Sequence, residues 1–247
     1  MSLLWDALRK LVRVMAVPQY RRAFLRHRVA AAIEHEHVLS GLELDTVVDI
    51  GANRGQFALC ARRLYPLAQI YSFEPLRKPS NIWLDTFKGD SRATLFNSAV
   101  AAEPGNAVMH VAQWDVSSSL LPIGPGQIEN FPFTEESARE IVSTALLNQC
   151  LSAATIRGRA LLKIDVQGSE LSALRGCADL LEQFAYVYVE ASFVELYVGQ
   201  ALACDIVDFL RARNFRLACV TNLSYGTARR PIQADFLFAR PSGAAPG

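Results

Sequence analysis

The sequence predicts an α/β fold: a mostly parallel sheet with helices on both faces and an antiparallel hairpin near the C-terminus. From residue 44 onward, short β-branched stretches alternate with helical stretches, which is typical of parallel strands joined by helices. The last two predicted strands, 215–220 and 234–239, are separated by a turn-rich stretch without a helix, so one of them must run antiparallel. A chain of 247 residues, 51% of them hydrophobic, is long enough for one domain with a full core.

The N-terminal residues are predicted to form helices outside this sheet. Residues 3–15 place apolar side chains at helical spacing with basic residues between them, Pro18 ends this helix, and a second helical stretch runs from 20 to about 39. We favour packing of these helices against the domain, although a basic amphipathic helix can also lie on an anionic membrane surface. The chain is therefore divided into an N-terminal helical extension, a main domain and a disordered tail: 1–43, 44–241 and 242–247.

The main domain begins with a clear strand pattern. Residues 46–50 are short, β-branched and apolar and lead into Gly51, as expected of a buried strand that feeds a tight turn. Residues 104–134 interrupt the alternation with a strand near 108–112 and a mobile loop, and 135–154 are expected to be partly helical. The regular elements are predicted in this order: strand 46–50, helix 56–65, strand 69–73, helix 81–87, strand 93–100, strand 160–166, helix 170–181, strand 186–191 and helix 203–213.

Composition argues against several classes of protein. A net charge of +1 gives no overall field that selects nucleic acid, and no basic aromatic patch occurs. The five cysteines form no CxxC pair, so neither a zinc site nor a disulfide framework is indicated, and a reducing cytoplasm is expected. Charged residues interrupt the N-terminal apolar run, which argues against a signal peptide, and no stretch approaches the roughly 20 apolar residues of a membrane span.

The turn after the first strand carries the strongest functional signal. Gly51 lets the backbone bend sharply near a ligand, and Gly55 lets the next helix start close to it. Glu74 ends the second strand about 20 residues later, where an acid would bind a ribose diol. The pattern predicts a site for an adenosine-containing ligand. Its candidate residues are Asp49, Gly51, Ala52, Asn53, Gly55, Glu74 and Pro75, with Asn97, Ser98 and Ala99 beside the adenine.

The same turn separates two possible cofactors. A dinucleotide needs bare backbone N–H groups for its pyrophosphate, hence GxGxxG, whereas this turn has the spacing GxxxG with Asn53 near its middle. S-adenosylmethionine has no phosphate but carries an amino-acid end and a sulfonium, for which Asp49 and Asn53 are suitable partners. With Glu74 and the terminal hairpin added, the pattern favours S-adenosylmethionine over NAD(P).

A second group of charged residues ends two neighbouring strands on the same rim. Lys163 and Asp165 share one face of their strand, and Glu190 ends the next strand beside them. Burying such charges is costly unless they are used, although an ion pair or a helix cap would also explain them. Methyl transfer to a hydroxyl needs alignment and removal of one proton. We therefore assign Asp165 and Glu190 as base or hydroxyl ligands and Lys163 as an electrostatic aid; a divalent cation could bind there, but nothing specifies a metal.

Other polar residues are assigned by their position in the chain. Four follow the third strand and are assigned to a loop that covers the substrate: His110, Asp115, Ser118 and Ser119. The histidines of the N-terminal helices are expected at the surface: His27, His35 and His37.

At these residues the chain resembles the FkbM family of S-adenosylmethionine-dependent methyltransferases. The matching stretches span roughly residues 44–240 and are VVDIGANRGQFA (47–58), YSFEP (71–75), NSAV (97–100), SSSLL (117–121), LLKIDVQGSELSALRG (161–176) and YVYVEAS (186–192). The resemblance implies a seven-stranded class I methyltransferase (Rossmann-like) fold. It also implies O-methylation, often of sugars in glycolipids, polysaccharides or nodulation-type factors, or of polyketide hydroxyls. The cofactor residues that it implies are Asp49, Gly51, Asn53, Gly55 and Glu74.

The leading hypothesis is an S-adenosylmethionine-dependent O-methyltransferase acting on a small-molecule or glycan hydroxyl. Two alternatives stay open at this point. One is an NAD(P)-dependent oxidoreductase on the same rim. The other is a non-catalytic adaptor that keeps the fold and uses its basic N-terminus to contact a membrane or a partner. The sequence fixes neither the acceptor nor the oligomeric state.

Overall fold

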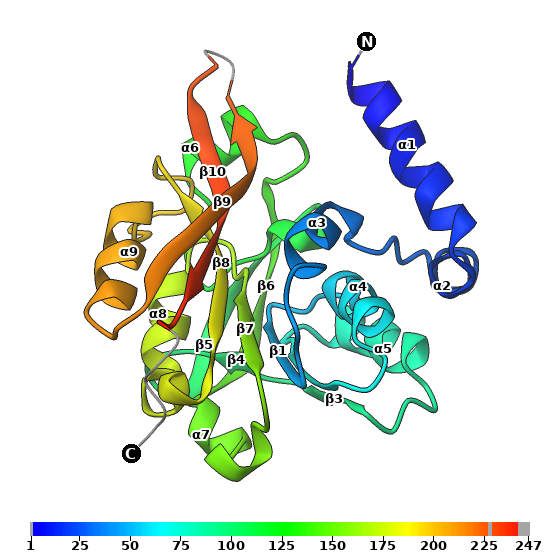
Figure 1. Cartoon of the computed structure of the whole chain (residues 1–247). Coiled ribbons are helices and arrows are strands. Elements are labelled where there is room, and N and C mark those ends of the chain that lie inside the picture. The colour runs from blue at the N-terminus through cyan, green and yellow to red at the C-terminus, as the bar shows by residue number, and fades with distance from the viewer. Residues whose placement is uncertain (1, 227–228, 242–247) are drawn as a thin grey trace.

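The computed structural model describes residues 2–226 and 229–241 and confirms the predicted architecture (Figure 1). Seven strands form the main sheet in the order β3-β2-β1-β7-β8-β10-β9, and β10 runs antiparallel to both of its neighbours. The strands are β1 (Thr46–Ile50), β2 (Gln69–Phe73), β3 (Ala93–Phe96), β7 (Ala160–Ile164), β8 (Tyr186–Ser192), β9 (Arg216–Tyr225) and β10 (Pro231–Ala239). The tail expected at 242–247 lies outside the described residues.

Different helices cover the two faces of the main sheet (Figure 1). α4 (Gln56–Leu64) and α5 (Arg77–Thr86) pack on one face, and α8 (Glu170–Gly176) and α9 (Ala203–Arg211) pack on the other. β1 and β7 are buried at every residue, as expected of apolar strands covered on both faces. Because parallel strands end at the same edge of the sheet, the turns after β1, β2 and β7 meet there.

The N-terminal extension packs into the same core as α4. Tyr20, Val29 and Ile33 are buried there together with Phe57. The predicted helix over 20–39 is interrupted because Arg28 adopts the left-handed conformation, with φ of 59°, and ends the second helix. The observed elements are α1 (Ser2–Ala16), α2 (Pro18–His27), the 3-10 turn η1 (Ile33–His35) and α3 (Glu36–Leu39).

α1 contacts the rest of the chain through its second half. Val14 is buried, and Lys10 Nζ lies 2.9 Å from a carboxylate oxygen of Glu34. From residue 8 of this helix onward, the exposed large apolar side chains are Leu8, Leu11 and Val12. Among the described residues, no helix is both long enough and apolar enough to span a bilayer.

The middle of the chain differs from the predicted elements in two places. The strand expected at 93–100 is divided: β3 stays in the main sheet, whereas β4 (Ala99–Val100) joins a second sheet. The amide of Asn97 donates to the carbonyl oxygens of Glu74 and Pro75 at 2.9 and 3.0 Å, which holds the chain in a turn between the two strands.

The stretch 135–154, expected to be partly helical, is mostly a strand, and its helical part is short. β6 (Glu136–Ala145) pairs with β5 (Gly105–Ala112) and β4 in a three-stranded sheet of order β4-β6-β5, and α7 (Leu147–Cys150) and the 3-10 turn η3 (Ala153–Thr155) follow it. Most side chains of β6 are exposed, so polar residues obscure the strand pattern in the sequence. Pairing with β5 over its full length decides the conformation, as is common where cross-strand contacts override local preference.

The segment between β5 and β6 is held by contacts, in contrast to the mobile loop expected there. It contains η2 (Asp115–Ser117) and α6 (Pro125–Asn130). Two isolated β-bridges, His110 with Ser119 and Ile123 with Tyr197, tie it to neighbouring segments. This segment therefore forms a wall beside the edge where the parallel strands end.

Candidate active site

The turn after β1 is bent as the sequence predicts. Gly51 has φ of +79°, and a Cβ at this position would lie 1.8 Å from the carbonyl oxygen of Asp165. The N–H groups of Gly51 and Ala52 both donate to the carbonyl oxygen of Phe73 at 3.0 Å. The ends of β1, β2 and β7 therefore close around a position that accommodates only glycine.

Gly55 packs closely against aromatic side chains at the start of α4. It has φ of +91°, and a Cβ there would lie 2.7 Å from the ring of Phe87 and 2.9 Å from that of Trp83. It starts α4, as predicted, but it lines neither of the two cavities described below.

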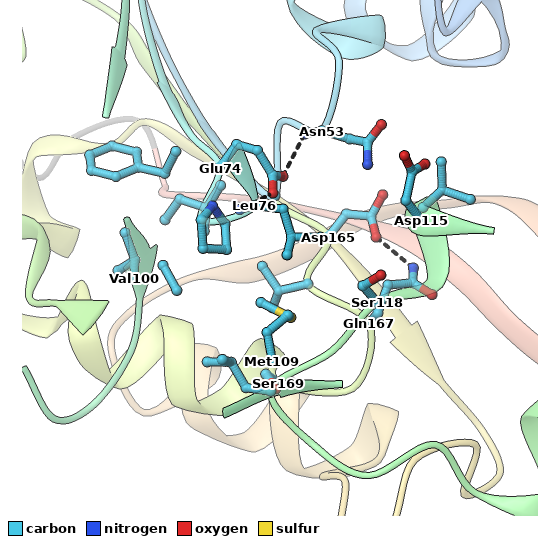
Figure 2. Close-up of a pocket in the computed structure, with 18 residues that line it drawn as sticks. Asn53, Glu74, Leu76, Val100, Met109, Asp115, Ser118, Asp165, Gln167 and Ser169 are labelled. Atoms are coloured by element: carbon cyan, nitrogen blue, oxygen red, sulfur yellow. Dashed lines mark hydrogen bonds between the residues drawn. The ribbon is translucent and has the colours of Figure 1, made fainter. Parts of the chain in front are cut away.

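Glu74, directly after β2, is a buried carboxylate that is 5% exposed. One oxygen accepts the N–H of Asn53 at 2.9 Å, and the other accepts the N–H of Leu76 at 2.8 Å (Figure 2). Burial raises the pKa of Glu74 to about 7, although these two N–H groups lower it. Each carboxylate oxygen has a second lone pair, so Glu74 can still accept hydrogen bonds from a ligand.

Glu74 lines a cavity of about 560 Å³ at the edge of the main sheet, which we call the inner cavity (Figure 2). The predicted site residues that line it are Gly51, Asn53, Glu74, Pro75, Ala99, Asp115, Ser118 and Asp165. The lining residues that the sequence analysis missed are Ile50, Phe73, Leu76, Val100, Met109, Val116, Leu120, Val166, Gln167 and Ser169. Met109 belongs to β5, so the unpredicted second sheet supplies part of the wall.

Three predicted cofactor residues support the turns from outside the inner cavity. Asp49 is fully buried beneath Gly51. The side-chain amide of the exposed Asn97 donates to the carbonyl oxygens that follow β2. Ser98 Oγ donates to the carbonyl oxygens of Ala99 and Ser143 at 3.1 and 3.2 Å. These three residues therefore support the turns and do not line the inner cavity.

Lys163 is buried beneath the same turn. Its ammonium donates to the carbonyl oxygen of Gly51 at 3.1 Å and lies 3.0 Å from Asp49 Oδ1 and 3.8 Å from Asp165 Oδ2. Burial by itself would lower the pKa of Lys163, but the charges of Asp49 and Asp165 raise it above its ordinary value. Lys163 is therefore a fixed positive charge below the site.

Asp165 and Glu190 are brought together by the side-chain amide of Gln167. Its Nε2 donates to Asp165 Oδ1 at 2.8 Å and to Glu190 Oε2 at 3.0 Å, and its Oε1 accepts the hydroxyl of Tyr197 at 2.8 Å (Figure 2 shows the Asp165 bond). Gln233 donates to the other oxygen of Glu190 at 2.8 Å. Burial, followed by the charges of Asp165 and other neighbouring carboxylates, raises the pKa of Glu190 well above its usual range.

Two of the four residues assigned to the substrate-covering loop face the inner cavity. Asp115 Oδ2 accepts a hydrogen bond from Arg54 at 2.6 Å, which ties η2 to the turn after β1, and Ser118 lies beside it (Figure 2). His110 and Ser119 are buried and line neither cavity, and His110 Nδ1 lies 2.6 Å from a carboxylate oxygen of β6.

A second hollow, of about 1140 Å³, opens beside the inner cavity, and we call it the outer cleft. The two share Gly51, Asn53, Val116 and Asp165, so they meet at the turn after β1. The other residues of the outer cleft are Lys10, Arg28, Ala30, Ala32, Glu34, His35, Ala52, Arg54, Gln56, Phe57, Trp114 and Lys163. Ten of these twelve were not assigned to the site by the sequence analysis, and six of the ten precede β1, outside the stretches that match the family.

Unpartnered polar atoms indicate that the inner cavity binds a ligand. Ser169 Oγ and Asp115 Oδ1 are buried and have no hydrogen-bond partner among the described residues, and both residues line the cavity. Buried polar atoms are nearly always paired, so a ligand with polar edges fits here. The spare lone pairs of Glu74 and the apolar walls suit a ribose and a base, and S-adenosylmethionine contains both. Within 2–226 and 229–241, no cluster of three or more histidine, cysteine, aspartate or glutamate side chains is placed to hold a metal ion.

A family model and one named relative each match most of this chain. The family model of the methyltransferase FkbM domain matches residues 49–217. The 2-O-methyltransferase NoeI of Sinorhizobium fredii (strain NBRC 101917 / NGR234) is 28% identical over 185 residues, which cover 71% of this chain and 76% of the relative.

Two solved structures are similar at low sequence identity. An uncharacterized protein from Listeria monocytogenes serotype 4b superposes with a TM-score of 0.50 at 6% identity, over 85% of this chain and 68% of that one. The precorrin-6y C5,15-methyltransferase from Geobacter metallireducens GS-15 gives a TM-score of 0.48 at 13% identity, over 87% of this chain and 95% of the other. At such identities a structural likeness concerns the fold alone.

Proposed function

The chain belongs to the FkbM methyltransferase family, and from this premise we propose that it transfers the methyl group of S-adenosylmethionine to a hydroxyl of a glycan or another small molecule. It is an S-adenosylmethionine-dependent methyltransferase; the hydroxyl and the acceptor class are the proposal. The observation that carries it is the junction at Gly51 and Asp165, where a largely apolar cavity opens onto a polar cleft. The 2-O-methyltransferase activity named for the Sinorhizobium relative supports the same reaction.

In this proposal the nucleoside of S-adenosylmethionine occupies the inner cavity, with its sulfur at the junction. Glu74 accepts the ribose hydroxyls, and Leu76, Val100 and Met109 contact the adenine. When bound, the cofactor supplies an electrophilic methyl group on a positively charged sulfur. The negative charge of Asp165 at the junction suits the cationic end of this ligand.

The outer cleft suits a sugar acceptor. Trp114 is 55% exposed and lines the cleft, so its ring offers a flat apolar surface to the face of a pyranose. Arg28, Glu34 and Gln56 line the same cleft and present donors and acceptors to hydroxyl groups. We therefore favour a sugar hydroxyl over the hydroxyl of an apolar polyketide.

The polar residues of the junction would orient the acceptor. Glu190 lines neither cavity, and its two oxygens accept the side-chain amides of Gln167 at 3.0 Å and Gln233 at 2.8 Å, so it suits positioning of Gln167 better than removal of a proton. Asp165 is 38% exposed and shares the amide of Gln167 with Glu190. Lys163 contributes its positive charge from below.

The family assignment bears on the two alternatives left open by the sequence analysis. Membership of a methyltransferase family argues against an NAD(P)-dependent oxidoreductase and favours an enzyme over a non-catalytic adaptor. Contact of α1 with an anionic membrane is compatible with catalysis, and the exposed Leu8, Leu11 and Val12 are the observation that favours it. Co-sedimentation of the chain with phosphatidylglycerol vesicles tests this contact; recovery of all protein in the supernatant contradicts it.

A direct assay tests the proposed reaction. The chain is incubated with S-adenosylmethionine labelled in its methyl group and with a panel of p-nitrophenyl glycosides. We expect label on at least one glycoside and, by NMR of the product, a methyl ether on a ring oxygen. Transfer to amines alone, or no transfer to any hydroxyl acceptor of the panel or of a polyketide panel, contradicts the proposal. Calorimetry with S-adenosylhomocysteine measures cofactor binding separately.

A further inference from the structure

His35, expected at the surface, instead lies against the polar edge of the main sheet. It ends η1 in the N-terminal extension, and its side chain is 16% exposed. The ring packs edge-on against Phe57 and Tyr188, with centroid distances of 5.4 and 5.5 Å. Both aromatic partners fix the plane of the imidazole.

One nitrogen of this imidazole faces a buried carboxylate. His35 Nδ1 lies 3.3 Å from Asp235 Oδ2 on β10 and 3.0 Å from the hydroxyl of Tyr188 on β8. The same oxygen of Asp235 accepts the Tyr188 hydroxyl at 3.1 Å and the amide of Asn222 at 2.7 Å. Burial would raise the pKa of Asp235, but His35 and these donors outweigh it and hold the pKa below its ordinary value.

The carboxylate selects the tautomer of the ring. Besides Asp235, Nδ1 has the Tyr188 hydroxyl at 3.0 Å and the amide nitrogen of Asn222 at 3.3 Å as neighbours, and both of these groups donate to Asp235 Oδ2. Because an ionised Asp235 can only accept hydrogen bonds, Nδ1 of the neutral imidazole carries the proton. The lone pair then lies on Nε2, which has no hydrogen-bond partner among the described residues. A histidine held in this way by a carboxylate has the arrangement of a general base.

The position of the ring is also suitable. His35 lines the outer cleft together with Asp165 and Lys163, and this cleft meets the inner cavity at the turn after β1. β-Strand register places Asp235 opposite Glu190, so the carboxylate that orients His35 belongs to the same polar edge as the residues that would hold the acceptor.

We propose that His35 is the general base of the reaction and that Asp235 is its positioning residue; this inference rests on the proposed hydroxyl methylation. The acceptor oxygen forms a bond to the methyl carbon as the bond between that carbon and sulfur breaks, and the electron pair of the broken bond stays on sulfur. The hydroxyl proton passes to Nε2 of His35. The resulting imidazolium is stabilised by Asp235 and later releases the proton to solvent.

The other polar residues of the junction are less suited to this role. Glu190 lines neither cavity, and its two oxygens accept the side-chain amides of Gln167 and Gln233. Lys163 is protonated and paired with Asp49. Asp165 Oδ1 accepts the amide of Gln167 at 2.8 Å, and its Oδ2 lies 3.8 Å from the ammonium of Lys163.

The test compares His35→Gln with His37→Gln, using the glycoside that the wild-type enzyme methylates best. His37 is two residues away on α3 and exposed, so its variant controls for a change in the same segment. We expect kcat of H35Q to fall by about 100-fold or more, because general-base catalysis contributes factors of that size. We expect H37Q to match the wild type, and the Kd of S-adenosylhomocysteine to change less than about threefold in both variants, within the error of additive local effects.

A pH profile distinguishes a base from a structural residue. The wild-type kcat should fall at acid pH as Nε2 becomes protonated. The charged or titratable groups around the ring are Asp235, Tyr188 and Asp49 on the sheet and Asp165, Lys163 and Arg28 in the cleft. In Asp235→Asn the imidazolium loses its counter-charge, so this acid limb should move to lower pH while kcat falls. A merely structural Asp235 would leave the limb in place.

The outcomes separate the two proposals. A wild-type enzyme that methylates no hydroxyl overturns the proposed function and the base together. A wild-type enzyme that methylates a hydroxyl, with H35Q equally active, overturns the base alone. Loss of S-adenosylhomocysteine binding in folded H35Q makes His35 a cofactor ligand and also overturns the base. If H35Q fails to fold by circular dichroism, D235N decides: an unshifted acid limb overturns the proposal.

Discussion

The inner cavity and the outer cleft meet at Gly51 but are built in different ways. The inner cavity depends on backbone: Glu74 is oriented by the N–H groups of Asn53 and Leu76, and the turn is closed around Gly51. The outer cleft depends on side chains from distant segments, such as Lys10, Glu34, Trp114 and Lys163. The first is therefore constrained by short stretches of sequence, and the second by how the N-terminal extension packs.

This difference indicates how function is divided between the two. A site built by backbone around a buried carboxylate suits a ligand that does not change, and the family model covers its turn and both strand ends. A cleft built by side chains can change its acceptor without disturbing the sheet. Six of its sixteen lining residues precede the family match, including Lys10 and His35. We infer that the extension determines the acceptor.

The largest expected effect comes from Gly51→Ala. The new Cβ would lie 1.8 Å from the Asp165 carbonyl oxygen, and φ is +79°, so β1 and β7 must separate. We expect a loss of at least about 3 kcal/mol in the free energy of unfolding and no measurable binding of S-adenosylhomocysteine. Urea unfolding and calorimetry measure both.

Gly89→Ala is the matched control for this variant. Gly89 has φ of +88°, but a Cβ there meets nothing within 4 Å. Only the backbone strain remains, so about 1–2 kcal/mol should be lost with the cofactor affinity unchanged. Equal effects of the two substitutions would show that the close approach at Gly51 does not matter.

Glu74→Gln should weaken S-adenosylhomocysteine by about 10- to 100-fold, since hydrogen bonds to a charged group are worth about 1.5–3 kcal/mol. The pKa of Glu74 is about 7, so the fraction ionised rises between pH 6 and pH 8. Ribose hydroxyls donate, which favours the ionised form. The wild-type Kd should therefore fall about tenfold over this range, and the Glu74→Gln variant should lose that part of the pH dependence. Calorimetry at several pH values measures the Kd of the wild type and of the variant. An equal pH dependence in the two proteins contradicts the assignment of Glu74 to the ribose.

The same carboxylate gives a stability prediction with a defined sign. The pKa of Glu74 in the folded chain, about 7, lies above its ordinary value of 4.5. The folded state therefore binds more protons than the unfolded state between these values, and the free energy of unfolding falls as pH rises through them. Without ligand, Glu74→Gln should gain stability relative to the wild type from pH 5 to pH 8. If the difference in the free energy of unfolding between the two proteins stays the same from pH 5 to pH 8, the pKa of Glu74 is not raised.

The contrast between the cavities also explains what the sequence could predict. Gly51 and Glu74 lie in contiguous patterns, because a sharp turn and a ribose ligand each require one residue type at one place. The main sheet follows from the same local signals. β6 could not be predicted, since its exposed face hides the strand pattern and its pairing with β5 is a long-range contact. His35 and Asp235 have no local pattern either, because only the folded chain brings η1 against β10.

A smaller effect is expected from Trp114→Ala in the outer cleft. Loss of a flat ring from the acceptor should raise the KM for the glycoside by about five- to tenfold, which corresponds to about 1 kcal/mol. The kcat and the Kd of S-adenosylhomocysteine should stay within about twofold, since Trp114 does not line the inner cavity. Trp114→Phe keeps a ring and is the control. A fall in kcat without a change in KM would remove Trp114 from acceptor binding.

The smallest effect is expected from Lys10→Ala, which tests how the extension is attached. Lys10 and Glu34 are both 41% exposed, and such surface pairs contribute less than about 1 kcal/mol. Glu36 differs, because it is buried and accepts hydrogen bonds from Arg13, Arg63 and Tyr20 at 2.7, 2.7 and 2.9 Å. Glu36→Gln should cost about 2 kcal/mol in urea unfolding and raise the acceptor KM, whereas Lys10→Ala should change neither measurably. If Lys10→Ala raised KM as much as Glu36→Gln did, the side chains of α1 would contribute directly to acceptor selection. Acceptor specificity would then depend on the first helix as well as on η1.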